Sequence, residues 1–161
     1  MTFFLILLGV IAFIIAPIIA LKPRGKQSQL EKLRLLAREK GALYSLRRLP
    51  PLKTDTDASP VWTVYTVAPN EKLSHQDEWI LRRTQYPHEL NFFKEWDWAN
   101  DNRPPESVQN FLLKRLVDIP DSVMGFAAGH SGVSFFWKEE DDKETLLSLI
   151  DLLKHLQALY H

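Results

Sequence analysis

The longest apolar stretch of the chain is an uncharged run over residues 2–21, TFFLILLGVIAFIIAPIIAL. At about 1.5 Å per residue, a helix of this length spans the roughly 30 Å hydrocarbon core of a bilayer. No basic residue precedes the run, and no clean small-x-small site follows it, so the run does not fit a cleaved signal peptide. The pattern therefore predicts a single transmembrane helix over residues 2–21.

Basic residues lie on one side of this run only. Nothing but Met1 precedes the run, and positively charged flanks stay in the cytoplasm. We therefore expect a single-pass membrane protein with its N-terminus outside and its C-terminal part in the cytoplasm. The basic residues that follow within 20 positions are Lys22, Arg24, Lys26, Lys32, Arg34, Arg38 and Lys40.

Residues 22–41 are predicted to form a basic juxtamembrane amphipathic helix. Apolar residues recur at helical spacing over residues 26–40, and Gly41 is a plausible stop. Two interpretations stay open: the helix packs on the following domain, or it lies on anionic lipid. The second interpretation predicts membrane-surface contacts from Lys22, Arg24, Lys26, Lys32, Arg34 and Arg38.

Residues 42–161 are predicted to form a cytoplasmic α+β domain. Residues 42–49 and the β-branched run 61–67, VWTVYTV, indicate an antiparallel strand pair with a long polar connection. Residues 122–128 and 133–138 flank Gly-His-Ser-Gly, which is typical of a β-hairpin.

Helices are expected between and after these strands. Ser74-x-x-Asp77 resembles a capping box and predicts a short helix through about Arg83. Further helices are expected from Pro87 or Glu89 and from Pro104, the latter ending at Pro120. The final helix is capped by Asp141 or Asp142 and runs to about Leu159. The predicted fold is a transmembrane helix followed by a mainly antiparallel sheet of about four strands with packed helices.

The final helix is apolar over an arc of about 240°, whereas one core-facing stripe needs roughly 100° or more. Either neighbouring helices cover its second side or another chain does. The loop WDWANDN combines aromatic, amide and carboxylate side chains, as binding surfaces do. The candidate partner surface predicted from both features contains Trp96, Trp98, Leu147, Leu152 and Leu159.

Composition and charge narrow the classes of function. Cysteine is absent, which excludes disulfides, thiolate catalysis and cysteine-based zinc sites. The net charge of zero hides an uneven distribution of charge along the chain. Residues 1–53 carry ten basic and two acidic side chains, whereas residues 54–161 carry ten basic and 18 acidic side chains. The acidic distal part repels phosphate, so no nucleic-acid partner is expected.

No motif with a known chemistry is convincing. Gly129-His130-Ser131-Gly132 resembles a serine-hydrolase elbow only superficially, since Val133 replaces its last glycine and a strand follows. The five histidines show no metal-ligand spacing, and no Gly-rich phosphate loop occurs. We therefore expect no cofactor, no metal and no catalytic site that could be named.

Several short segments carry a resemblance to a known group of proteins. They are Ala16-Pro17, Lys22-Pro23, Leu33-Arg34 through Gly41, Arg48-Leu49-Pro50 and Phe136-Trp137. In these segments the chain resembles uncharacterised single-span proteins of gammaproteobacterial inner membranes. That resemblance implies a bacterial inner membrane and no particular activity or site residue.

Three functions remain open from the sequence. The first is a membrane-anchored protein-interaction module, such as an accessory or assembly subunit, with a lipid bilayer and a protein partner or second copy as partners. The second is an enzyme at the membrane surface that uses His130 or carboxylates near Trp96. The third is an outward-facing ligand-binding domain, if the topology is reversed.

Overall fold

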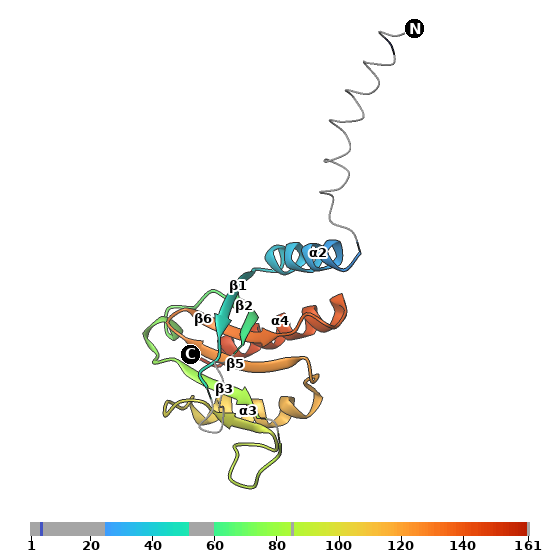
Figure 1. Cartoon of the computed structure of the whole chain (residues 1–161). Helices are drawn as coiled ribbons and strands as arrows, with labels where there is room; N and C mark the ends of the chain where they lie inside the picture. The colour runs from blue at the N-terminus through green and yellow to red at the C-terminus, as the bar shows by residue number, and fades with distance from the viewer. Residues whose placement is uncertain (1–3, 5–24, 52–59, 85, 161) are drawn as a thin grey trace. The chain divides into compact units, whose positions relative to one another are not determined.

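The computed structural model describes residues 4, 25–51, 60–84 and 86–160 (Figure 1). The chain forms two compact units, residues 1–32 and residues 33–161. In the first unit the structure describes Phe4 and the beginning of helix α2 (Lys26–Glu39). The second unit contains the end of α2 and all the elements described below.

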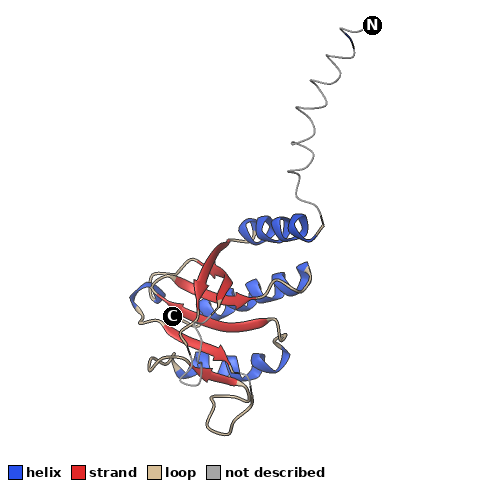
Figure 2. Cartoon of the chain, in the orientation of Figure 1, coloured by secondary structure: helices blue, strands red, loops and turns tan. Residues whose placement is uncertain are grey.

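The second unit is built on an antiparallel sheet with the strand order β1-β2-β6-β5-β3-β4 (Figure 2). Its strands are β1 (Ala42–Arg48), β2 (Val61–Val67), β3 (Trp79–Arg83), β4 (Trp96–Trp98), β5 (Val123–Gly129) and β6 (Gly132–Trp137). Its further helices are α3 (Glu106–Arg115), α4 (Lys143–Ala158) and the 3₁₀ helices η1 (Leu73–His75) and η2 (Leu116–Asp118).

Local sequence explains the best-defined elements. β1 and β2 pair over seven residues, from Ala42 opposite Val67 to Arg48 opposite Val61. The β5–β6 hairpin turns at His130 and Ser131, as predicted, and Gly132 follows with φ +112°. A Cβ atom at Gly132 would lie 2.1 Å from the Val67 carbonyl oxygen, so only glycine fits there.

Helix α4 also begins where the sequence predicts. The Asp142 carboxylate accepts a hydrogen bond from the Thr145 backbone N–H at 2.9 Å and caps the helix. Along α4, Ile150 and all the leucines except Leu147 face the main core, together with one face of the sheet. A smaller cluster, centred on Val64 and Phe136, lies on the opposite face of the sheet.

The predicted fold class is wrong in its number of strands, because the sheet has six and not about four. The two extra strands, β3 and β4, lie where helices and a loop were expected. Strand β3 is buried on both faces, because Trp79 and Leu81 lie in the main core and Ile80 lies in a second cluster on the opposite face, so its sequence WILRR shows no alternation. The capping-box signal at Ser74 corresponds only to η1.

The predicted transmembrane helix and single-pass localisation are also corrected. In the part of the chain that the structure describes, no helix is both long and apolar enough to cross a membrane. The longest, α4, has 16 residues and spans about 24 Å, short of the roughly 30 Å hydrocarbon core. Residues 2–21, from which the span was predicted, lie outside the described residues except for Phe4.

Candidate functional site

Strand β1 is the end strand of the sheet, and no described residue pairs with its outer side. The opposite end strand, β4, is only three residues long, whereas β1 has seven. Native sheets usually protect their edges with short strands, charges or a covering element, because a free edge offers unpaired N–H and C=O groups. β1 is therefore the one long strand edge open to pairing within the described sheet.

Apolar side chains are exposed on both faces of this edge. Leu43 is 60% exposed on one face. Leu46 is 60% exposed on the other face, where Tyr44 and Val61 are also exposed. We call these four residues, Leu43, Tyr44, Leu46 and Val61, the β1 patch. Because successive side chains of a strand alternate, the patch can contact both faces of an added strand.

A partly buried ion pair lies beside the β1 patch. The Arg34 guanidinium donates two hydrogen bonds to the Glu139 carboxylate, from Nε at 3.0 Å and from Nη2 at 2.7 Å. The central carbon of the Arg34 guanidinium lies 4.2 Å from the centroid of the Tyr44 ring. Arg34 therefore joins the end of α2 to β1 and to the segment between β6 and α4.

The Glu139 carboxylate is held by four donors in all. Tyr65 donates its hydroxyl hydrogen to Oε1 at 2.6 Å, and Thr63 donates to Oε2 at 3.1 Å. The side chain of Glu139 is only 5% exposed, and its backbone takes the left-handed φ of +56°. Non-glycine residues seldom hold that conformation, at a cost of order 1–3 kcal/mol, unless their surroundings fix it.

This cluster shifts the pKa of each of its ionisable members. Burial pushes the pKa of Glu139 upward, but the hydrogen bonds from Arg34 and Tyr65 outweigh it, so the net pKa is lowered. The hydrogen bond to Glu139 raises the pKa of Arg34. Burial, followed by the bond to Glu139, raises the pKa of Tyr65. Glu139 and Arg34 therefore stay charged, and Tyr65 stays neutral, at neutral pH.

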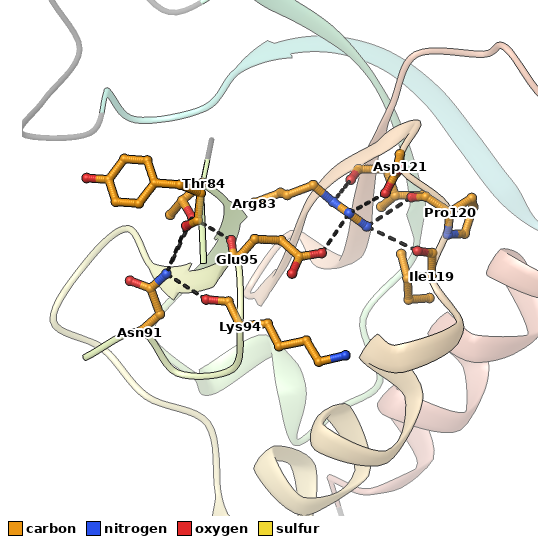
Figure 3. A network of polar contacts seen from close by, with 10 residues as sticks. Arg83, Thr84, Asn91, Lys94, Glu95, Ile119, Pro120 and Asp121 are labelled. Atoms are coloured by element: carbon orange, nitrogen blue, oxygen red, sulfur yellow. Dashed lines mark hydrogen bonds and ion pairs between the residues drawn. The ribbon is translucent and has the colours of Figure 1, made fainter. Parts of the chain in front are cut away.

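A buried arginine, Arg83, holds the other end of the sheet together (Figure 3). Its Nη1 donates to Glu95 at 2.9 Å and to Asp121 at 2.8 Å. Its Nε and Nη2 donate to three backbone carbonyl oxygens, those of Ile119, Pro120 and Val123. A guanidinium has five N–H donors, so Arg83 has none left for a ligand. We interpret this cluster as structural.

The structure does not gather the residues of the predicted partner surface into one exposed patch. Trp96 is fully buried, with the Arg83 guanidinium carbon 4.5 Å from its ring centroid. Leu152 is also buried, and Trp98, Leu147 and Leu159 are half-buried. The ring of Phe111 in α3 stacks on the ring of His155 in α4. Neighbouring elements of the same unit thus cover much of the apolar arc.

The predicted membrane-surface residues have different surroundings. Lys22 and Arg24 lie outside the described residues, whereas Lys26, Lys32 and Arg38 are exposed. Arg34 differs from them because its guanidinium is bound to Glu139.

The residues considered for catalysis do not converge. His130 lies on the exposed turn between β5 and β6. Near Trp96, Glu95 is bound to Arg83, and Asp97 accepts a hydrogen bond from the Trp98 backbone N–H at 2.8 Å. Over residues 25–51, 60–84 and 86–160, no three histidine, aspartate or glutamate side chains lie together in a way that could hold a metal ion.

Local sequence pattern predicts neither the Arg34 and Arg83 clusters nor the open edge of β1. Arg34 and Glu139 are 105 positions apart, and only the fold brings them together. A signal for the β1 patch did exist in ALYSLRR, because Leu43 and Leu46 must point to opposite faces of a strand. A strand of that kind is either buried on both faces or leaves apolar side chains exposed, and β1 exposes a leucine on each face.

No family model matches this chain, and no curated protein and no solved structure shows a significant match to it.

Proposed function

We propose that this protein is a protein-interaction module that adds an extended segment of a partner protein to its sheet, alongside β1. The observation that supports this function best is the exposed apolar patch on a seven-residue end strand. In such binding, main-chain hydrogen bonds to the free edge provide affinity, and side-chain contacts on alternate positions provide specificity.

The surroundings of β1 favour this role. Its inner side is fixed by the seven-residue register with β2. Arg34 and Glu139 hold the neighbouring end of α2 and the segment before α4. The edge is thus already in strand conformation before a partner arrives, which lowers the conformational entropy lost on binding.

A double substitution tests the proposal. Peptides of 12 residues would be selected from a random displayed library on the full chain, and their affinity would then be measured for the L43S/L46S variant. Each leucine is 60% exposed and would be buried on docking, so each substitution by serine removes about 1 kcal/mol of apolar burial. We expect Kd to rise by about tenfold or more, since 1.4 kcal/mol corresponds to tenfold.

The matched control is L90S/V117S, which removes two exposed apolar residues far along the chain from β1. It should change Kd by less than about twofold, because surface substitutions outside a binding site have small effects. Selected peptides that bind L43S/L46S and the unchanged chain equally well would contradict the proposed function.

A further inference from the structure

We infer that the segment bound along β1 is acidic, with carboxylates at its ends and apolar residues at alternate central positions. This inference rests on the proposed function. It comes from the charges that flank the β1 patch. Arg38 and Lys40 precede the strand, and Arg48 ends it. All three side chains are exposed.

These cations differ from the other basic residues near the edge. Arg47 is bound to Glu78 at 2.8 Å, and Arg34 to Glu139 at 2.7 Å. Among the described residues, by contrast, no carboxylate lies within ion-pair distance of Arg38, Lys40 or Arg48. Positive charge is therefore free at both ends of an apolar edge.

The register of β1 gives the pattern of the partner. Tyr44, Leu46 and Arg48 lie on one face, since their partners in β2 are Tyr65, Thr63 and Val61. An added strand would therefore place an apolar residue against Leu46 and, two positions further on, a carboxylate against Arg48. At the other end the register stops at Ala42, because Lys40 closes the last turn of α2 and Gly41 turns the chain with φ +86°. A carboxylate just beyond this end of the added strand would be attracted by Arg38 and Lys40 at the end of the helix.

The same charges argue against a second copy of this chain as the occupant. β1 contains no carboxylate. If two copies paired antiparallel about Ser45, Arg48 of one copy would lie opposite Ala42 of the other. At both ends of the pair, Arg48 of one copy would then come next to the end of α2 of the other copy, which carries Arg38 and Lys40. Like charges in such positions are destabilising, so an acidic segment fits this edge better than another β1.

Three synthetic peptides test the inference. They share a central Val-Thr-Ile-Thr-Val segment and carry two residues at each end: Asp and Glu, Asn and Gln, or two Lys. On the full chain at low salt, the acidic peptide should bind about tenfold or more tightly than the amide peptide, because two or three exposed ion pairs each contribute a few-fold. At 0.5 M salt this difference should shrink, since screening weakens exposed ion pairs.

Charge reversal locates the effect. In R48E the preference for the acidic over the amide peptide should be lost, whereas in K114E, which changes an exposed lysine on α3, it should be retained. Equal binding of the acidic and amide peptides, with both weakened by L43S/L46S, would overturn this inference and leave the proposed function standing. If L43S/L46S binds the peptides as tightly as the unchanged chain does, both the inference and the proposed function are contradicted. If the chain dimerises without peptide and its β1 amides are then protected from exchange, a second copy occupies the edge, and the inference of an acidic partner is contradicted.

Discussion

Replacing Arg83 with methionine is expected to lower the free energy of unfolding by about 2–4 kcal/mol, less than for a fully buried ion pair because the side chains of Glu95 and Asp121 are 29% and 100% exposed. Arg83 is 9% exposed and satisfies two carboxylates and three backbone carbonyl oxygens. Methionine retains much of the packing against Trp96 but supplies no donor. The Pro120 carbonyl oxygen keeps its hydrogen bond from the Val123 backbone N–H at 3.0 Å, but the Ile119 and Val123 carbonyl oxygens lose the Arg83 donors, and that loss adds to the effect.

Urea denaturation followed by tryptophan fluorescence measures this change. The matched control is R115M, which replaces an exposed arginine that also lies near an aromatic ring, 5.7 Å from the Phe111 centroid. It should change the free energy of unfolding by less than about 0.5 kcal/mol. If R83M does not fold, R83K keeps the charge but lacks the five-donor geometry, and it should still be clearly destabilised. A stability of R83K equal to that of the unchanged chain would contradict the structural role.

The second large effect is expected at Glu139. E139Q keeps the size of the side chain but removes the charge that Arg34 binds. We expect the free energy of unfolding to fall by about 2–3 kcal/mol, less than for a fully buried pair because the Arg34 side chain is 32% exposed. A double-mutant cycle with R34Q isolates the coupling between the two residues.

The same pair predicts a pH dependence. Folding lowers the pKa of Glu139 from its ordinary value of 4.5. A carboxyl group with a lowered folded-state pKa binds more protons when unfolded, so its stabilisation is complete above pH 4.5 and is lost as pH falls through the folded-state pKa. The difference in stability between the unchanged chain and E139Q should therefore shrink below pH 4.5.

The matched control for Glu139 is its exposed neighbour, in the variant E140Q. This variant should unfold at nearly the same urea concentration as the unchanged chain at neutral pH. A constant difference between E139Q and the unchanged chain from pH 7 down to the acid limit of folding would rule out the carboxylate as its source. An E139Q variant as stable as the unchanged chain would contradict a stabilising role for the Arg34–Glu139 ion pair.

Elements with strong local signals were predictable from the sequence. The β-branched run of β2, the glycines of the β5–β6 turn and the Asp142 cap each act within a few residues of one another. Strands β3 and β4 were not predictable in this way. The spacing of Leu90, Phe93 and Trp96 fits one side of a helix, yet Leu90 is 86% exposed and Trp96 is fully buried in a strand.

The candidate site depends on long-range order, which local pattern does not contain. The sequence predicts strand β1, but only the strand order makes β1 an edge. The acceptors of Arg83 include three backbone carbonyl oxygens, and because every residue has one, the residue types at those positions do not predict the contacts. The split of charge along the sequence was visible from the start, and the structure adds that Arg38, Lys40 and Arg48 flank one open strand.

Hydrogen exchange of the backbone amides, with and without the acidic peptide, tests the central claim most directly. Half of the β1 amides should point to the free edge and exchange quickly without peptide, because they have no described partner. The predicted result is that saturating acidic peptide slows exchange in β1 and leaves β4 unchanged. If the peptide binds while exchange in β1 is unchanged, strand addition at this edge is contradicted.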